Sequence, residues 1–204
     1  YKIEQLENDE PIFKTSQMIR SEKQVEAEYI KTGIKQLDKK LRGLKKGFVT
    51  CLSGLRACGK SSIISQFTVE AVNQGYKVAM FSGELTNINT LNWLVLQSAG
   101  RDNVLETQYQ GFYQTKSEAQ ERIDKWLDEK VYIYNNNYGN KFEWILEQLK
   151  KVVEEKKVDL VILDNLMALN INSLDRDKFI QQSLFVEQLE TFAKQSNIHI
   201  LFVA

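Results

Sequence analysis

The sequence predicts an α/β fold in which a mainly parallel central sheet is flanked by helices. Five apolar, β-rich runs alternate along the chain with segments whose apolar residues recur at helical spacing. Several of these runs are apolar on both faces, as expected for strands covered on both sides. The runs occupy residues 48–54, 77–82, 131–134, 158–164 and 198–204. Strands that alternate with helices in this way indicate α/β architecture.

The segments between the strands carry helical patterns with recognisable ends. A helix is expected from Lys60 to about residue 73, with Gly75 placed where a helix ends. A further helix is expected from Ser117 to Asp128, because Ser117 and Gln120 have the spacing of a capping box. A short helix and a turn are expected within residues 32–47, and further helices at about 87–99 and 177–195. Another helix, after the turn at 135–140, places apolar residues from Phe142 to Val153 on one face, and a polar connection runs to about residue 116.

Composition limits the class of protein. The chain has 204 residues, of which 43% are hydrophobic, and its 27 Lys and Arg residues equal its 27 Asp and Glu residues. The chain therefore has no net positive charge that would attract nucleic acid, although a local stripe of basic residues is compatible with this balance. Cys51 and Cys58 are the only cysteines, so we expect a reducing, cytoplasmic location rather than a disulfide framework. No apolar run is long enough for a membrane span, and we expect no membrane partner.

Two domains of unequal size are expected. Residues 1–30 are polar and charged, with a weak helical pattern from Ser16 to about Ala27, and we interpret them as an N-terminal linker or arm. Residues 31–204 form the main domain. The chain begins at Tyr1 and stops at Ala204 within an apolar run, so we expect it to be a piece of a longer protein that contains the C-terminal part of this domain.

The stretch GLRACGKS at 54–61 has the pattern G-x-x-x-x-G-K-[ST] between a strand and a helix, which is typical of a phosphate-binding P-loop. Gly54 and Gly59 allow the backbone N–H groups to turn toward phosphates at the positive end of the following helix. Lys60 is expected to reach the β- and γ-phosphates of ATP, and the Ser61 hydroxyl to bind Mg²⁺. The alternative is a glycine turn without a ligand. The expected nucleotide-binding residues are Gly54, Leu55, Arg56, Ala57, Cys58, Gly59, Lys60, Ser61 and Ser62.

Two acidic residues follow other strands and are expected at the same edge of the sheet. Asp164 ends the apolar run LVILD and is predicted to hold Mg²⁺ through a water molecule, although an aspartate that only caps a turn would give the same pattern. Asn165 stands where some P-loop ATPases carry a catalytic glutamate, so the base must come from elsewhere. Glu84 in FSGELT follows the second strand, and we predict that it activates the attacking water. A surface acid beside a turn glycine is the alternative for Glu84.

Two further residues attract attention without a predicted role in the chemistry. His199 is the only histidine and lies in an apolar run, so we expect an ordinary strand residue. Cys58 lies inside the P-loop, where a helix N-terminus lowers thiol pKa values in general. It is interpreted as a small side chain at a free position of the motif, with an oxidation-sensitive thiol as the alternative.

Four segments in order, TGIKQLDKKLRGLKKG, SGLRACGKS, FSGELT and LVILDNL, resemble the RecA-like ATPase core of DnaB-type hexameric replicative helicases. The segments DNLMAL and FAKQSNIHILFVA look more like the phage primase-helicase and Twinkle branch. The resemblance covers about residues 30–204 and implies the roles given above for Lys60, Ser61, Glu84 and Asp164. It also implies a hexameric ring that moves on single-stranded DNA, with residues 1–30 as a linker that packs on the adjacent subunit. In that family the γ-phosphate sensor, the basic DNA-binding loop and the arginine finger would lie beyond Ala204.

The expected function is therefore ATP hydrolysis, with Glu84 and Lys60 as catalytic residues and Mg²⁺ as cofactor, coupled to unwinding of duplex DNA. Two alternatives stay open at this point. The T-G-I-x-x-L-D segment at 32–38 also occurs in RecA, RadA and KaiC relatives, so a recombination ATPase or a KaiC-like signalling ATPase would share the same core.

Overall fold

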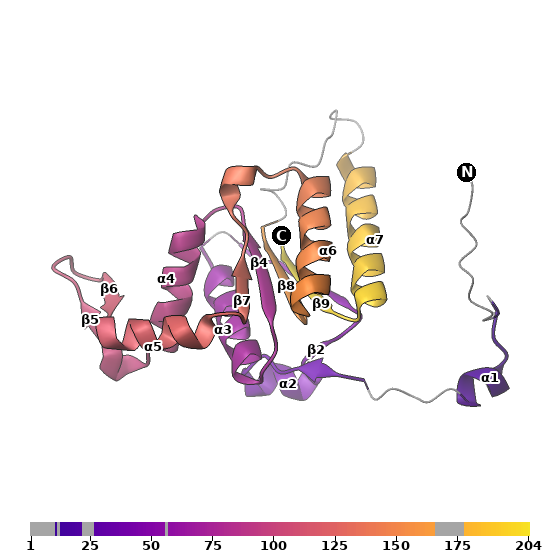
Figure 1. Cartoon of the computed structure of the whole chain (residues 1–204), viewed down its shortest axis with the longest axis horizontal. Coiled ribbons are helices and arrows are strands. Elements are labelled where there is room, and N and C mark those ends of the chain that lie inside the picture. Colours follow the sequence, from indigo (N-terminus) through magenta and orange to yellow (C-terminus); the bar gives the residue numbers. More distant parts are fainter. Residues whose placement is uncertain (1–10, 12, 22–26, 56, 166–177) are drawn as a thin grey trace.

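A five-stranded parallel sheet forms the centre of the molecule (Figure 1). The structure is a computed structural model that describes residues 11, 13–21, 27–55, 57–165 and 178–204, without the side chains of 178–182. Every pairing in the central sheet is parallel, which confirms the predicted fold class. In spatial order the strands are β3 (Val49–Leu52), β9 (His199–Val203), β8 (Leu160–Asp164), β4 (Val78–Ser82) and β7 (Val131–Ile133).

Helices cover both faces of this sheet. The helices α6 (Phe142–Lys156) and α7 (Lys178–Ser196) pack on one face, and α3 (Lys60–Asn73) and α4 (Asn87–Ser98) lie on the other (Figure 1). The sheet therefore has an apolar cluster on each side. Strands with two covered faces need apolar residues at every position, which explains why these runs do not alternate with polar residues.

β8 shows how one strand serves both clusters. Val161 and Leu163 belong to the cluster beneath α6 and α7, whereas Leu160 and Ile162 belong to the cluster beneath α3 and α4. Side chains in a strand point alternately to opposite faces, so this division follows from the backbone. All four side chains are completely buried, and each contributes roughly 1.5–3 kcal/mol through removal from water. The position of Asp164 is thus fixed by a strand that is anchored on both sides.

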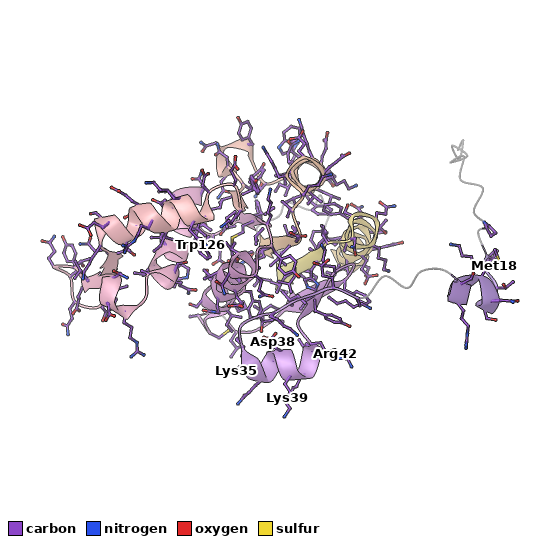
Figure 2. The ribbon with its side chains drawn as sticks, turned by 60° about the horizontal axis from the view of Figure 1, so that its bottom comes forward. Met18, Lys35, Asp38, Lys39, Arg42 and Trp126 are labelled. Atoms are coloured by element: carbon purple, nitrogen blue, oxygen red, sulfur yellow. The ribbon has the colours of Figure 1, made fainter. Side chains whose placement is uncertain are left out.

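The lead-in segment before the sheet is closed by one aspartate. α2 (Lys35–Leu41) carries Asp38, whose Oδ1 accepts hydrogen bonds from the Thr32 backbone N–H at 2.8 Å and from the Thr32 hydroxyl at 2.9 Å. The Gly33 N–H donates to the other carboxylate oxygen. Figure 2 shows α2 with Asp38 between Lys35 and Arg42. The T-G-I-x-x-L-D pattern therefore encodes a self-bonded turn.

The same turn is attached to the end of α3 that lies away from the phosphate loop. The Gln74 side chain, at the C-terminal end of α3, accepts from the Lys31 N–H at 2.9 Å and donates to the Lys31 carbonyl at 3.0 Å. The lead-in pairs through β1 (Tyr29–Ile30) and β2 (Leu44–Lys45), two short antiparallel strands. These bonds hold the lead-in segment against the C-terminal end of α3.

A peripheral unit lies beyond α4. It contains η1 (Arg101–Asn103), β5 (Val104–Glu106), β6 (Tyr113–Thr115) and α5 (Ser117–Leu127), with the β5–β6 hairpin projecting from the body (Figure 1). This hairpin lies in the predicted polar connection, where its short strands carry little apolar pattern. The capping box expected at Ser117 was wrong: the N-cap is Lys116, without a side-chain cap bond, and Ser117 is already helical. The predicted helix itself is present.

The remaining predicted elements agree with the structure in type. Gly75 has φ +92° directly after the end of α3, as expected for the residue that stops a helix. In the N-terminal segment, α1 (Ser16–Ser21) occupies the first part of the weak helical pattern, and residues 22–26 lie outside the described part of the chain. Among the described residues, no helix is both long and apolar enough to cross a membrane.

Candidate nucleotide-binding site

The strands β3, β4 and β8 end at the same edge of the sheet, and a cavity of about 790 Å³ lies there. Segments from four separate parts of the sequence surround it. Ligands of parallel α/β sheets bind at this edge because the strand ends and helix N-termini open onto it. The lining residues are Gly54, Ala57, Cys58, Gly59, Lys60, Ser61, Ser62, Glu84, Asp164, Asn165 and Ala204.

The phosphate loop has the backbone that its glycines predict. Gly59 has φ +86° and Ala57 has φ +59°, so the chain passes twice through the left-handed region before α3 begins at Lys60. Gly59 is also the N-cap of α3, and no side chain caps this helix end. The first N–H groups of α3 therefore face the cavity without a side-chain acceptor, which is the arrangement that binds phosphate.

Gly54 lies against the side chain of Cys58. A Cβ atom at this position would lie 2.9 Å from Cys58 Sγ, so the thiol would have to shift. The thiol of Cys58 thus packs against the glycine that opens the loop, in agreement with its interpretation as a small side chain. Both cysteines are free.

Lys60 is held inside the loop. Its ammonium group donates to the Gly54 carbonyl at 2.6 Å and to the Leu55 carbonyl at 3.1 Å. The lysine is therefore folded back over the loop, with its charge at the cavity wall. Leu55 contributes only this carbonyl, since its side chain is 84% exposed and does not line the cavity.

The Ser61 hydroxyl and the Asp164 carboxylate meet across the cavity floor. Ser61 Oγ donates to Asp164 Oδ2 at 3.4 Å, although 103 residues separate them in the sequence. Asp164 is only 7% exposed. Burial raises the pKa of this carboxyl, and the nearby charge of Glu84 raises it further, while the Ser61 hydrogen bond and the Lys60 charge act in the opposite direction. An additional cation beside Asp164 would relieve this unfavourable burial of negative charge.

Glu84 reaches the same cavity from the adjacent strand. β4 and β8 are paired so that Ser82 lies beside Asp164, and the Gly83 N–H donates to the Asp164 carbonyl. Glu84 follows directly and accepts a hydrogen bond from the Asn165 side chain. The structure therefore brings together the four residues for which chemistry was predicted, Lys60, Ser61, Glu84 and Asp164. Arg56, also predicted in the loop, lies outside the described residues.

Two asparagines near Glu84 were not predicted as part of the site. Asn165 donates to the Glu84 carboxylate, and Asn136 donates to the carbonyls on either side of Glu84. The peptide bond between Asp164 and Asn165 is cis. Nothing in a single sequence links position 136 to position 84, because the link depends on β7 lying beside β4.

The residues present fit Mg²⁺ together with phosphates. Within the described ranges, no three His, Cys, Asp or Glu side chains gather closely enough to hold a metal ion on their own. Mg²⁺ in phosphate-transfer sites takes only one or two protein ligands and completes its shell with water and phosphate oxygens. Ser61 and Asp164 would supply such a pair, and Mg²⁺ would neutralise charge that develops on the phosphates.

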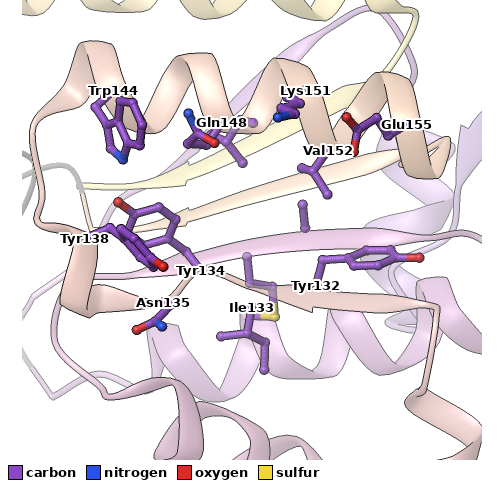
Figure 3. A pocket seen from close by; sticks show the side chains of 13 residues that line it. Tyr132, Ile133, Tyr134, Asn135, Tyr138, Trp144, Gln148, Lys151, Val152 and Glu155 are labelled. Carbon is purple, nitrogen blue, oxygen red and sulfur yellow. The ribbon is translucent and has the colours of Figure 1, made fainter.

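A second cavity, of about 500 Å³, lies between β7 and α6 and has a different character (Figure 3). Tyr132, Tyr134, Tyr138 and Trp144 line it, with Val152 toward the far end of the helix (Figure 3). No glycine is among the residues that line it. The glycine loop before α3 opens onto the first cavity.

Comparison with known proteins agrees with this site. Residues 29–204 match the sequence model of the DnaB-like helicase C-terminal domain family. The chain belongs to this family. The RecA-like ATPase core of DnaB-type helicases, predicted from the four motifs, is thereby confirmed. The lean toward the phage and Twinkle branch stays a prediction.

Curated relatives include the replicative DNA helicase DnaB of two Helicobacter pylori strains. Strain J99 gives 23% identity over 182 residues and strain 26695 gives 24% over 183 residues. Each match covers 84% of this chain and 35% of the relative, so the chain spans about a third of their length. The DnaB-like domain is thus one part of the proteins that it resembles.

Solved structures show the same fold. One of them, described as an ATPase domain, superposes with a TM-score of 0.68 at 13% identity, covering 86% of this chain and 63% of that one. A DnaB-like replicative helicase, described with its interactions with primase, gives a TM-score of 0.67 at 14% identity and covers 86% and 43%. At these identities the likeness concerns the fold of the DnaB-like domain.

Proposed function

We propose that this DnaB-like domain hydrolyses ATP to drive translocation on single-stranded DNA and unwinding of duplex DNA. The observation that carries the proposal is the meeting of Ser61 and Asp164 at 3.4 Å in one cavity with Glu84 and Lys60. A phosphate loop alone would be compatible with a nucleotide that is only bound as well as with one that is hydrolysed. An acidic residue at two further strand ends favours hydrolysis.

Each residue has a definite part in the reaction. The loop N–H groups and Lys60 bind the phosphates, and Lys60 exchanges the Gly54 and Leu55 carbonyls for phosphate oxygens. Ser61 and Asp164 would hold Mg²⁺, with Asp164 acting through a bound water. Glu84 accepts a proton from the water that attacks the γ-phosphorus, while the bond between that phosphorus and the ADP oxygen breaks. The products are ADP and inorganic phosphate.

The proposed assembly is a hexameric ring in the cytoplasm. An arginine supplied in trans typically accelerates phosphoryl transfer by about 10³–10⁵-fold. The domain alone should therefore bind ATP but hydrolyse it slowly. We assign residues 1–30 as a linker that packs on the adjacent subunit, and residues 31–204 as the ATPase domain.

Lys60→Ala tests nucleotide binding directly. The substitution removes charge-assisted hydrogen bonds worth about 1.5–3 kcal/mol each, so the affinity for ATP should fall by about 100-fold or more. Titration of a fluorescent ATP analogue measures the loss. Lys125→Ala removes an exposed lysine on α5, which does not line the cavity, and serves as the matched control. Equal affinity in the two variants would contradict the proposal.

The motor activity requires a separate assay in the longer protein that we expect to contain this domain. ATP hydrolysis is measured with and without single-stranded DNA, together with strand displacement on a forked duplex. We expect DNA-stimulated hydrolysis and ATP-dependent strand separation. Stimulated hydrolysis without separation would overturn the unwinding function, and hydrolysis indifferent to DNA would overturn the coupling to DNA.

A further inference from the structure

Glu84 lies on a short loop, and residues from two other segments hold it: Asn165 bonds its carboxylate and Asn136 bonds the backbone beside it. The segment after β4 is exposed at both Gly83 and Glu84, so packing does not fix this side chain. A general base acts only when it lies within hydrogen-bond reach of the water that it deprotonates. The groups that hold Glu84 therefore matter for the rate of the proposed reaction.

The backbone on both sides of Glu84 is fixed by Asn136. This residue lies in η2 (Asn136–Tyr138), directly after β7. Its side-chain nitrogen donates to the Ser82 carbonyl and to the Leu85 carbonyl, each at 3.0 Å. Both partners are acceptors, so the amide must present its NH₂ group and uses both of its N–H bonds. One side chain thus closes the loop from Ser82 to Leu85.

Two further bonds complete this loop. The Leu85 N–H donates to the Ser82 hydroxyl at 3.1 Å, and the Gly83 N–H donates to the Asp164 carbonyl. The loop is consequently attached to β8 on one side and to η2 on the other. Its position relative to Asp164 is set by hydrogen bonds rather than by apolar packing.

The carboxylate itself is oriented by Asn165. The amide nitrogen of Asn165 donates to Glu84 Oε1. The opposite amide orientation would place two oxygen acceptors together, so the donor role is set by chemistry. This bond restricts the rotation of the carboxylate that would accept the proton. Asn165 directly follows Asp164, so the same strand end positions the Mg²⁺ ligand and the base.

We propose that Asn165 and Asn136 are positioning residues for ATP hydrolysis, Asn165 through the Glu84 carboxylate and Asn136 through the Glu84 backbone. The inference rests on the proposed function, because it assigns the two asparagines to the base of that reaction. Some P-loop ATPases carry the catalytic glutamate directly after the strand-end aspartate. In this chain that position is Asn165, whose amide holds Glu84. Neither asparagine touches the reacting atoms.

The first experiment measures kcat, KM and ATP affinity for Asn165→Ala and Asn136→Ala. A positioned general base contributes about 10²–10⁴-fold to a rate, so partial loss of its orientation should lower kcat by about 10–100-fold. KM and the affinity for ATP should stay within about twofold, since the phosphate loop is unchanged. Asn165→Gln retains the amide donor and should recover part of the lost rate. Asn137→Ala, at an exposed asparagine in the same turn, is the matched control and should leave kcat unchanged.

The second experiment separates positioning from a general structural effect. Each asparagine variant is combined with Glu84→Gln, and the residual hydrolysis is compared with that of Glu84→Gln alone. If the asparagines act through Glu84, the second substitution changes the residual rate by less than about twofold. An equal loss in both backgrounds, or a normal kcat for Asn165→Ala and Asn136→Ala, would overturn the inference.

Failure of the inference is distinguishable from failure of the proposed function. Suppose that Lys60→Ala no longer binds ATP and Glu84→Gln no longer hydrolyses it. If both asparagine variants then hydrolyse ATP at the normal rate, only the positioning roles are wrong. If Glu84→Gln itself hydrolyses ATP at the normal rate, the assignment of the base is wrong and the positioning roles fall with it. Thermal unfolding of every variant confirms that it is folded before its rate is interpreted.

Discussion

Gly59 is the residue at which the phosphate loop turns into α3. Its φ of +86° lies in the left-handed region, and a Cβ atom there would meet nothing within 4 Å. An alanine would therefore fit in space and would still be strained in its backbone. The loop depends on this residue for its conformation rather than for its packing.

We expect Gly59→Ala to lower the free energy of unfolding by about 1–2 kcal/mol, the usual penalty for a left-handed L-residue. The melting temperature should fall by roughly 2–4 °C per kcal/mol. ATP affinity should also fall, because the loop N–H groups move. Cys58→Ala, next to it on the same cavity, should change stability by less than about 0.5 kcal/mol. Thermal denaturation of the two variants checks this contrast, and equal stabilities would refute it.

Single residues of the site were predictable to different degrees. The motif spacing identified Lys60 and Ser61, and the positions at strand ends predicted Glu84 and Asp164 near them. The folded-back lysine and the Asn136 contacts were not predictable. They depend on side-chain geometry and on which strand lies beside β4, and neither is written in a single sequence.

α4 is the element that follows the Glu84 loop, and Thr86 caps it. The Thr86 hydroxyl accepts a hydrogen bond from the Asn89 N–H at 3.3 Å. This bond satisfies one of the N–H groups that a helix start leaves without an intrahelical partner. The cap thus joins the end of the Glu84 loop to a helix that packs against α3.

We expect Thr86→Ala to destabilise the protein by about 1 kcal/mol, as typical for loss of a capping hydroxyl. Thr86→Ser retains the acceptor and should stay close to the original protein. Urea denaturation measures both free energies of unfolding. If alanine and serine at this position give the same stability, the cap does not contribute.

β9 begins with a buried histidine, His199, which makes the stability of the protein depend on pH. Burial lowers the pKa of His199, while its ring Nδ1, 2.7 Å from the Lys45 carbonyl, favours the charged form. The ring is 1% exposed and neutral at neutral pH. As predicted, it is a strand residue of the core; it does not line the nucleotide cavity.

A pKa lower in the folded than in the unfolded chain makes stability depend on pH with a definite sign. Below about pH 6.5, the ordinary histidine value, the unfolded chain takes up a proton that the folded chain rejects. Stability should therefore fall as the pH decreases from about 6.5 toward the lower folded pKa. Urea unfolding between about pH 7.5 and pH 5 should show a smaller pH-dependent loss for His199→Gln. If His199→Gln and the original protein lose the same stability over this pH range, His199 is not the source of the pH dependence.

Elements with strong patterns were predicted well, and the short strand pairs outside the central sheet were missed. The central strands are apolar throughout and the helices between them have clear apolar stripes, so their type was readable. The pairs β1–β2 and β5–β6 were missed because strands of two or three residues carry no measurable alternation. The strand order of the sheet was also not predictable, since it depends on crossover connections rather than on local pattern.

The whole molecule combines a central sheet with a polar edge at which the proposed site lies. Apolar clusters pack on both faces of β8 and β4, and the ends of these strands carry Asp164 and Glu84. The phosphate loop follows β3, and β9 lies between β3 and β8 in the strand order. Membership of the DnaB-like helicase C-terminal domain family agrees with this arrangement. We propose that this edge hydrolyses ATP, with Glu84 as the base.

The most direct test compares Glu84→Gln with the original protein for both ATP binding and phosphate release. Glutamine retains the size of the side chain and one acceptor oxygen but cannot accept the proton. We expect ATP affinity within a few-fold of the original and steady-state phosphate release lower by about 10²-fold or more. Phosphate release by Glu84→Gln at a near-normal rate would contradict it and would place the base elsewhere.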